Sequence, residues 1–204
     1  MSHGTAVGDF LIRPGMPGDA AALAAFAERC FRDAFADQNN PSDLGLYITH
    51  AYGRPQQAAE LQDPLVVTVL AESGGRLAGF AQLRPGTTPD CVRAQRPIEL
   101  WRFYVDRPWQ GRGLAQALMS QVLAAARARD ADAIWLGVWE RNPRALAFYR
   151  KCGFVDVGQQ GFTLGTDSQT DRVMAQALAP EAGPHAANSE TSEGPCWRPS
   201  GSSD

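Results

Sequence analysis

A glycine-rich hexapeptide constrains most strongly what this chain can fold into. The hexapeptide, Gln110-Gly111-Arg112-Gly113-Leu114-Ala115, lies between an apolar strand-like run at 98–105 and a helix-like run at 114–129. A turn that leaves a strand and opens a helix carries several unpaired backbone N–H groups, and these attract phosphate together with the positive end of the helix dipole. Because glycine has no Cβ, Gly111 and Gly113 let a bulky anion approach the backbone. The hexapeptide therefore predicts a phosphate-binding turn.

Two common phosphate-binding motifs do not match this turn. A P-loop needs a lysine directly after its last glycine, and none follows Gly113. The dinucleotide fingerprint needs a third glycine where this chain has Gln116. A Gly-x-Gly pair alone also occurs in purely structural turns, which leaves that alternative open.

A different pattern, Gln/Arg-x-x-Gly-x-Gly/Ala, is matched completely by Gln110, Gly113 and Ala115. Three further segments match in the same order, namely the strand-like runs at 99–105 and 133–139 and the helix-like run at 142–154. Together these four motifs make the chain resemble the GNAT family of acyl-CoA-dependent N-acetyltransferases.

The resemblance implies a mixed α/β fold, with a mostly antiparallel central sheet and helices on both sides. We expect this domain to span residues 10–179, after a flexible N-terminus at 1–9. Residues 180–204 are rich in Pro, Gly, Ser and Glu with few apolar residues, so we expect a disordered tail. Periodicity and breakers predict helices at 20–34, 42–50, 56–61, 114–129 and 143–152, and strands at 10–13, 65–71, 77–83, 98–105, 133–139, 154–158 and 172–178.

By the same resemblance, acetyl-CoA is the cosubstrate and the hexapeptide holds its pyrophosphate. The main chain of Phe103 and Val105 would hold the pantetheine arm through N–H and C=O groups, and the Val105 N–H would bond the thioester carbonyl. Asn142 would lie near that arm. The cofactor-binding residues implied in this way are Phe103, Tyr104, Val105, Gln110, Gly111, Arg112, Gly113, Leu114, Ala115, Asn142 and Tyr149.

Two residues are candidates for proton transfer. Tyr149 lies seven residues after Asn142, almost two helical turns, so the two share a side, and the resemblance implies that its phenol protonates the departing thiolate. A core aromatic beside Phe148 is the alternative. Glu99 alternates with Trp101, Phe103 and Val105, which predicts one shared strand face. The resemblance makes Glu99 a candidate general base, and a salt bridge to a nearby arginine is the alternative.

The acceptor site is expected on the first helices and the later strands. Within the family, segments 31–47, 135–140 and 169–171 are similar to spermidine/spermine acetyltransferases of the PaiA type. The substrate-binding residues that this similarity implies, or else members of the core, are Phe31, Phe35, Tyr47, Trp101, Trp139 and Glu140. Asp33 and Asp37 are also placed to attract a polycation, or to form a charged solvated face. We therefore expect a small amine substrate, with a polyamine preferred.

Bulk properties exclude several classes of protein. The 204 residues suit one domain, and a net charge of −3 gives no footprint for nucleic acid. No apolar run approaches the roughly 20 residues that span a bilayer, and residues 1–9 lack a signal peptide's charged and apolar parts, so we expect a cytoplasmic protein that does not enter the membrane. Four widely spaced cysteines predict reduced thiols and no metal site. The sequence leaves three other acceptors as alternatives, namely a protein N-terminus, a lysine and a drug-like amine. It also leaves open a non-catalytic acetyl-CoA sensor as the function and a homodimer as the assembly.

Overall fold

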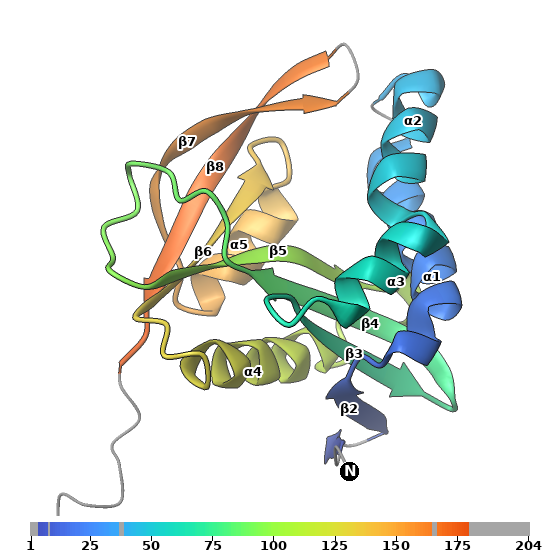
Figure 1. The fold of residues 1–204 in the computed structure, drawn as a ribbon. Coiled ribbons are helices and arrows are strands. Elements are labelled where there is room, and N and C mark those ends of the chain that lie inside the picture. The colour runs from blue at the N-terminus through green and yellow to red at the C-terminus, as the bar shows by residue number, and fades with distance from the viewer. Residues whose placement is uncertain (1–3, 8, 37–38, 165–166, 180–204) are drawn as a thin grey trace, which may run out of the picture.

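The computed structural model describes residues 4–7, 9–36, 39–164 and 167–179. These residues form one sheet with helices on both of its faces (Figure 1). The strands are β1 Thr5–Val7, β2 Phe10–Pro14, β3 Val67–Ser73, β4 Arg76–Arg84, β5 Pro97–Val105, β6 Ala133–Trp139, β7 Val155–Leu164 and β8 Asp167–Ala177. The helices are α1 Ala20–Phe35, α2 Pro41–Tyr52, α3 Arg54–Gln62, α4 Leu114–Arg127 and α5 Pro143–Lys151.

The sheet order is β1-β2-β3-β4-β5-β6-β8-β7, and every neighbouring pair is antiparallel except β5 with β6. The expected mixed α/β class with a mostly antiparallel sheet is therefore confirmed. Strand β1 lies within the segment expected to be a flexible N-terminus, where Thr5 pairs with Ile12 of β2. Strands β7 and β8 are also longer than predicted, and they pair as one long hairpin. The expected tail at 180–204 lies outside the described residues.

Strands β5 and β6 pair over three residues only. The paired positions are Pro97 with Ala133, Ile98 with Ile134 and Glu99 with Trp135. Beyond them β5 continues to Val105 and β6 to Trp139 without facing partners, so the two halves of the sheet diverge, as Figure 1 shows. Main-chain groups along this opening are therefore available to a ligand.

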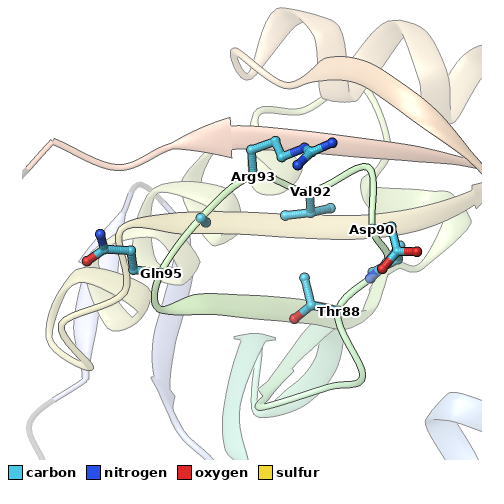
Figure 2. Close-up of a pocket in the computed structure, with 7 residues that line it drawn as sticks. Thr88, Asp90, Val92, Arg93 and Gln95 are labelled. Carbon is cyan, nitrogen blue, oxygen red and sulfur yellow. The ribbon is translucent and has the colours of Figure 1, made fainter.

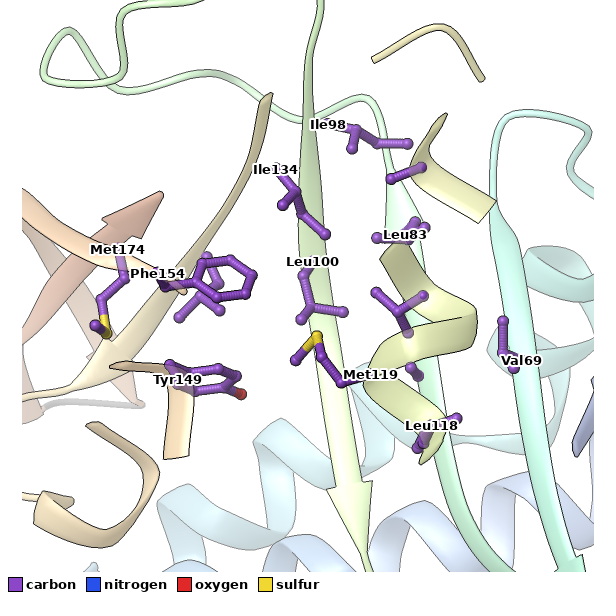
Figure 3. Packing of buried hydrophobic residues seen from close by; sticks show 14 of the residues in the cluster. Val69, Leu83, Ile98, Leu100, Leu118, Met119, Ile134, Tyr149, Phe154 and Met174 are labelled. Carbon is purple, nitrogen blue, oxygen red and sulfur yellow. The ribbon is translucent and has the colours of Figure 1, made fainter. Parts of the chain in front are cut away.

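Two hydrophobic clusters cover the two faces of the sheet. One packs α4 and α5 against the sheet through buried residues such as Leu118, Met119 and Tyr149 (Figure 3). The other packs α1 and α2 against β3 and β4 around Phe26, with Phe80 among its members. We call these two sides the α4–α5 face and the α1–α3 face. No described helix has the length and apolar character needed to span a bilayer.

A β-bulge at Trp101 changes which way β5 side chains point. Leu83 pairs with Leu100 and Gln82 pairs with Arg102, so Trp101 is the extra residue. Before the bulge Leu100 belongs to the α4–α5 face, and after it Phe103 and Val105 do. The predicted shared face for Glu99, Phe103 and Val105 is therefore wrong, because period-two alternation assumes a strand without a bulge.

A buried ion pair fixes α3 to the sheet on the α1–α3 face. The Arg102 guanidinium lies 2.5 Å from a Glu60 carboxylate oxygen, and both side chains are about 5% exposed. Arg102 also donates to Gln82 Oε1 at 2.7 Å and to the Ala51 carbonyl at 2.9 Å. Because a buried charge must be paired and hydrogen-bonded, this network accounts for a charged residue in a central strand.

The loop from 85 to 96 covers the far part of the α1–α3 face. Its Val92 packs with Trp135 of β6 and Val173 of β8 in a third small hydrophobic cluster. Figure 2 shows the hollow in this loop, with Val92 over β6 and the polar side chains of Thr88, Asp90 and Gln95 around its rim. None of the residues predicted to bind a cofactor or substrate lines this hollow.

Candidate active site

The hexapeptide forms the turn that the sequence predicted. Gly111 and Gly113 have φ of +78° and +86°, a left-handed conformation that glycine adopts without strain. A Cβ built on either glycine would meet no atom within 4 Å, so the space over the turn is open. Helix α4 begins at Leu114, and within the described chain no backbone acceptor takes the N–H groups of Leu114 or Ala115. These are the properties of an anion site.

Arginines add positive charge around this turn. Arg112 lies in the turn, with its guanidinium 5.4 Å from the Trp109 ring centroid. Arg144 of α5 donates to Gln110 Oε1 at 2.6 Å, which brings a second guanidinium to the turn. Open space, unpaired N–H groups and two cations together fit the pyrophosphate of a coenzyme A group.

The main chain at the end of β5 faces the opening between the strands. The Asp106 N–H donates to the Ala78 carbonyl of β4 at 2.9 Å. Because alternate residues of an antiparallel strand bond to the same neighbour, the main chains of Tyr104 and Arg102 also bond to β4. The main-chain groups of Val105 and Phe103 therefore point away from β4. The predicted use of Phe103 and Val105 main-chain groups is therefore geometrically available. One part needs correction, because the Val105 carbonyl already accepts a 2.8 Å hydrogen bond from Gln110 Nε2.

Tyr104 is not placed to bind a cofactor. Its main chain bonds within the β4–β5 ladder, and its side chain packs on the α1–α3 face. There its hydroxyl lies 3.2 Å from the Tyr52 hydroxyl, and burial raises the pKa of Tyr104. The main chain and side chain of Tyr104 are therefore both engaged within the protein, unlike the main-chain groups of Phe103 and Val105.

Tyr149 lies on the opposite face, beside the opening. Its ring contacts Phe103, Phe148 and Phe154 at centroid distances of 6.3, 5.5 and 5.7 Å. Among the described residues its hydroxyl has no hydrogen-bond partner, and Figure 3 shows that hydroxyl directed toward the β5 side, where Leu100 lies. Burial raises the pKa of Tyr149, so the phenol stays protonated at neutral pH. A protonated phenol at this position can act as a proton donor.

Asn142 begins the helix that carries Tyr149. Its Oδ1 accepts a 3.1 Å hydrogen bond from the Ala145 N–H, and Pro143 follows at the first helical position. Because the side-chain oxygen caps the helix, only the side-chain NH₂ group is left to donate to a ligand. Gly153, with φ of +92°, follows the end of this helix, close to the predicted end at residue 152.

Glu99 forms the salt bridge that was its alternative role. Its Oε2 lies 2.6 Å from the Arg84 Nε, and the Glu99 side chain is 12% exposed. The Arg84 guanidinium also stacks on Trp101, 3.7 Å from the ring centroid, and Arg102 stacks on the same ring at 3.7 Å. Trp101 is thus held by two cations, and Glu99 balances one of them.

Four of the predicted substrate-binding residues meet in one aromatic cluster. Phe31 contacts Phe35 and Tyr47 at 4.7 and 4.9 Å between ring centroids, and Phe35 contacts Trp139 at 6.1 Å. Phe31 is only 5% exposed, so it forms the buried part of the cluster. The partly exposed rings are those of Phe35, Tyr47 and Trp139, which we call the aromatic wall. Trp101 lies outside these ring contacts.

A hydrogen bond from β8 reaches the segment after α1, next to the aromatic wall. Gln169 Nε2 donates to Asn39 Oδ1 at 2.8 Å, and Asn39 Nδ2 donates to the Phe35 carbonyl at 2.8 Å. The start of β8 is therefore tied to the end of α1. Of the predicted acidic residues, Glu140 and Asp33 are exposed, and Asp37 lies outside the described residues.

The most buried acid of this wall lies in the segment 169–171 that resembles the PaiA type, but the sequence did not single it out as a site residue. Asp171 of β8 is half-buried and lies opposite Trp139 in the β6–β8 ladder. Burial and the nearby Glu140 raise the pKa of Asp171 to about 6. A glycine inside an apolar strand marks a close approach, and Gly137 was the signal that could have pointed to it.

Comparison with known proteins identifies the family to which this chain is similar. The acetyltransferase (GNAT) family model matches residues 22–154. An uncharacterized N-acetyltransferase of Mycobacterium bovis is 35% identical over 160 residues, which are 78% of this chain and 98% of that protein. The N-alpha-acetyltransferase RimI of Mycobacterium tuberculosis is 38% identical over 100 residues, which are 48% of this chain and 58% of that protein.

A solved structure supports the same fold. The PaiA N-acetyltransferase of Thermoplasma acidophilum, crystallised with coenzyme A, has a TM-score of 0.67 and 17% identity, covering 82% of this chain and 98% of that one. The family model spans more than half of the chain, and the opening, the glycine turn and the protonated tyrosine suit acetyl-CoA. The chain therefore belongs to the GNAT family of acetyl-CoA-dependent N-acetyltransferases.

Proposed function

We propose that the enzyme transfers the acetyl group of acetyl-CoA to a primary amine of a flexible cationic molecule, such as spermidine or spermine. The observation that carries this proposal is an aromatic wall beside an acid that has no ion-pair partner among the described residues. Phe35, Tyr47 and Trp139 form the wall, and Asp171 lies at its edge. Aromatic faces and carboxylates both attract ammonium groups.

A second acid, Glu140, lies near Asp171 at this wall. Glu140 lies close enough to Asp171 to raise the pKa of that carboxyl, and it is exposed at the end of β6. A polyamine bound with one amine at the opening would extend its remaining ammonium groups toward Glu140. An acceptor with a single ammonium group would have no second charge to place near Glu140.

The chemistry proposed for the site divides the groups between the two faces. The turn at 110–115 holds the pyrophosphate, and the Val105 N–H bonds the thioester carbonyl. Tyr149, on the α4–α5 face, donates a proton to the departing sulfur. The amine enters from the α1–α3 face, where the aromatic wall lies.

A protein N-terminus is the second candidate acceptor. RimI of Mycobacterium tuberculosis is an N-alpha-acetyltransferase by name, and the 100 residues matched to it favour this class. A lysine or a drug-like amine would use the same chemistry at nitrogen. A sensor without turnover is disfavoured, because it needs no protonated Tyr149 beside the opening. The cytoplasmic location expected from the sequence stays a prediction, and a homodimer stays open.

The test is a panel of amines with acetyl-CoA and detection of the product by mass. The panel contains spermidine, spermine, monoamines of equal length, a drug-like amine and peptides with a free N-terminus or lysine. Rapid acetylation of polyamines and slow acetylation of monoamines supports the proposal. Preference for a peptide α-amine moves the assignment to a protein acceptor. Binding of acetyl-CoA with no product from any amine would leave a sensor.

A further inference from the structure

We propose that Asp171 is the group that takes the proton from the attacking amine nitrogen. This assignment rests on the proposed function only in that the acceptor is an amine, whichever amine it is. Among acids near the opening, Glu99 was the sequence-based candidate for the same role. Three features of the structure support Asp171, and the third distinguishes it from Glu99.

The first feature is the position of Asp171 at the opening between β5 and β6. Gly137 lies two residues beyond Trp135, the last β6 residue that pairs with β5, and is exposed although its strand is central. A Cβ built on Gly137 would lie 3.1 Å from Asp171 Oδ2 and 2.8 Å from Gln160 Nε2. The carboxylate of β8 therefore reaches over Gly137 to the edge of the opening.

The second feature is the face on which Asp171 lies. Asp171 and Val173 are two residues apart on β8 and share a face, and Val173 packs with Trp135. Tyr149 belongs to the opposite, α4–α5 face. A thioester in the opening would therefore have a protonated phenol on one side and a carboxylate on the other. This is the arrangement that attack from one face and departure to the other require.

The third feature is that Asp171 lacks a cation. No hydrogen bond or ion pair reaches its carboxylate in the described part of the chain, whereas the Glu99 carboxylate is held 2.6 Å from Arg84. The charged and titratable neighbours of Asp171 are Glu140 at the end of β6 and Tyr47 on α2. Burial and Glu140 raise the pKa of Asp171 to about 6, so the group is ionised at pH 7 and more basic than an exposed aspartate.

The proposed step balances without a further reactant. The lone pair of the neutral amine forms a C–N bond with the thioester carbonyl carbon. The nitrogen then carries a surplus proton, which passes to the Asp171 carboxylate. The C–S bond breaks, and the sulfur takes the bond electrons and the proton of the Tyr149 hydroxyl. Solvent exchange returns a proton from Asp171 to Tyr149, so the products are the amide and the free thiol.

The test is the pH dependence of kcat/KM for wild type and Asp171→Asn, with any amine that the enzyme acetylates. For wild type, log kcat/KM should rise with a slope of about 2 below pH 6, where both Asp171 and the amine must lose a proton, and about 1 above it. Asp171→Asn should lower kcat/KM by about 10²-fold at pH 7.5 and give a slope of about 1 throughout. Asp171→Glu should recover part of the rate together with the change of slope.

Two further variants separate this role from a structural one. Glu140→Gln removes the charge that raises the pKa of Asp171, so the change of slope should move to lower pH. Glu99→Gln, which also removes a single carboxylate charge from the same face, should keep the change of slope at its wild-type pH. The assignment would be overturned if the pH profile of Asp171→Asn kept the change of slope. It would also be overturned if the pH profile of Glu99→Gln lost it.

Failure of the assignment is distinct from failure of the proposed function. If wild type acetylates no amine, the proposed function fails and Asp171 loses its role with it. If wild type acetylates an amine and Asp171→Asn keeps both rate and slope, the function stands and only the role of Asp171 falls. A melting curve for each variant shows whether a lost rate reflects an unfolded chain.

Discussion

The side-chain amide of Gln110 donates a 2.8 Å hydrogen bond to the main-chain carbonyl of Val105. This bond joins the first residue of the turn at 110–115 to the last residue of β5. The two segments that we propose bind acetyl-CoA are therefore linked directly to each other. Arg144 completes the link by donating to the other end of the same amide at 2.6 Å.

Replacing Gln110 should loosen this link. Gln110→Met keeps the length of the side chain and removes the donor to Val105 and the acceptor for Arg144. A net contribution of about 1 kcal/mol for a hydrogen bond predicts a KM for acetyl-CoA raised about 3- to 10-fold, with a smaller change in kcat. Steady-state kinetics with varied acetyl-CoA measure this. An unchanged KM would mean that β5 and the turn are fixed independently of Gln110.

Gly113→Ala should weaken acetyl-CoA binding at least tenfold, because a Cβ would enter the open space over the turn. The φ of +86° adds strain of about 1–2 kcal/mol for a residue other than glycine. Gly74→Ala is the matched control, since Gly74 has φ of +56°, has open space above it, and lies in the β3–β4 hairpin. Calorimetric titration should show weaker binding for Gly113→Ala alone, although both variants melt earlier. Equal binding by both would remove the turn from the cofactor site.

Tyr149→Phe should lower kcat by about 10²-fold and leave acetyl-CoA affinity nearly unchanged. The aromatic contacts with Phe103 and Phe154 persist in this variant, and the deleted hydroxyl bonds to no other described residue. The melting temperature should therefore change little. Single-turnover kinetics with saturating acetyl-CoA isolate the effect on chemistry. If the variant kept the wild-type kcat, Tyr149 would be a packing residue of the core and not the proton donor.

Arg102→Met should destabilise the fold by about 3–5 kcal/mol, because it leaves the Glu60 carboxylate buried without its cation. Adding Glu60→Leu to Arg102→Met removes the orphaned charge and should restore most of the loss. Urea unfolding at pH 7 measures both effects. A double variant no more stable than the single one would show that the cost comes from lost packing on Trp101 and Tyr52.

Asp171→Asn should stabilise the fold at neutral pH. The folded pKa of about 6 exceeds the unfolded value of about 4, so the folded chain binds more protons and stability falls as pH rises from about 4 to about 6. This destabilisation is complete above pH 6 and absent below pH 4, and asparagine does not carry it. Calorimetry should show the variant melting above wild type at pH 7.5, with a smaller difference at pH 4.5. The reverse order would indicate that Asp171 is engaged in a stabilising ion pair.

Local signals predicted most of the fold. The break between the predicted strands at 65–71 and 77–83 and the starts of the predicted helices at 114 and 143 each depend on a few adjacent residues, and each is found in the structure. The bulge at Trp101 was not predictable, because it depends on how β4 and β5 align. A single strand shows its own periodicity and not its register with a partner.

The same limit applied to the acceptor site. Glu99 and Arg84 are 15 positions apart and meet because they pair across β4 and β5. Asp171 reaches Gly137 because β8 pairs with β6 in one register. The ring contacts of Phe35 and Tyr47 depend on how α1 and α2 pack. Motifs carried by one segment were therefore predicted, and sites assembled from several segments were only partly predicted.

The bulge at Trp101 has a practical consequence for changing what this enzyme accepts. Up to Glu99 the odd-numbered positions of β5 lie on the α1–α3 face, where we propose that the acceptor binds, and from Arg102 onward the even-numbered positions do. A library that randomised every second position along β5 would thus alter the acceptor side at one end and the coenzyme side at the other. Engineering that respects the bulge could vary one substrate's contacts while leaving the other's intact. Because of one added residue, the positions that lie on each face change from odd to even numbers partway along the strand.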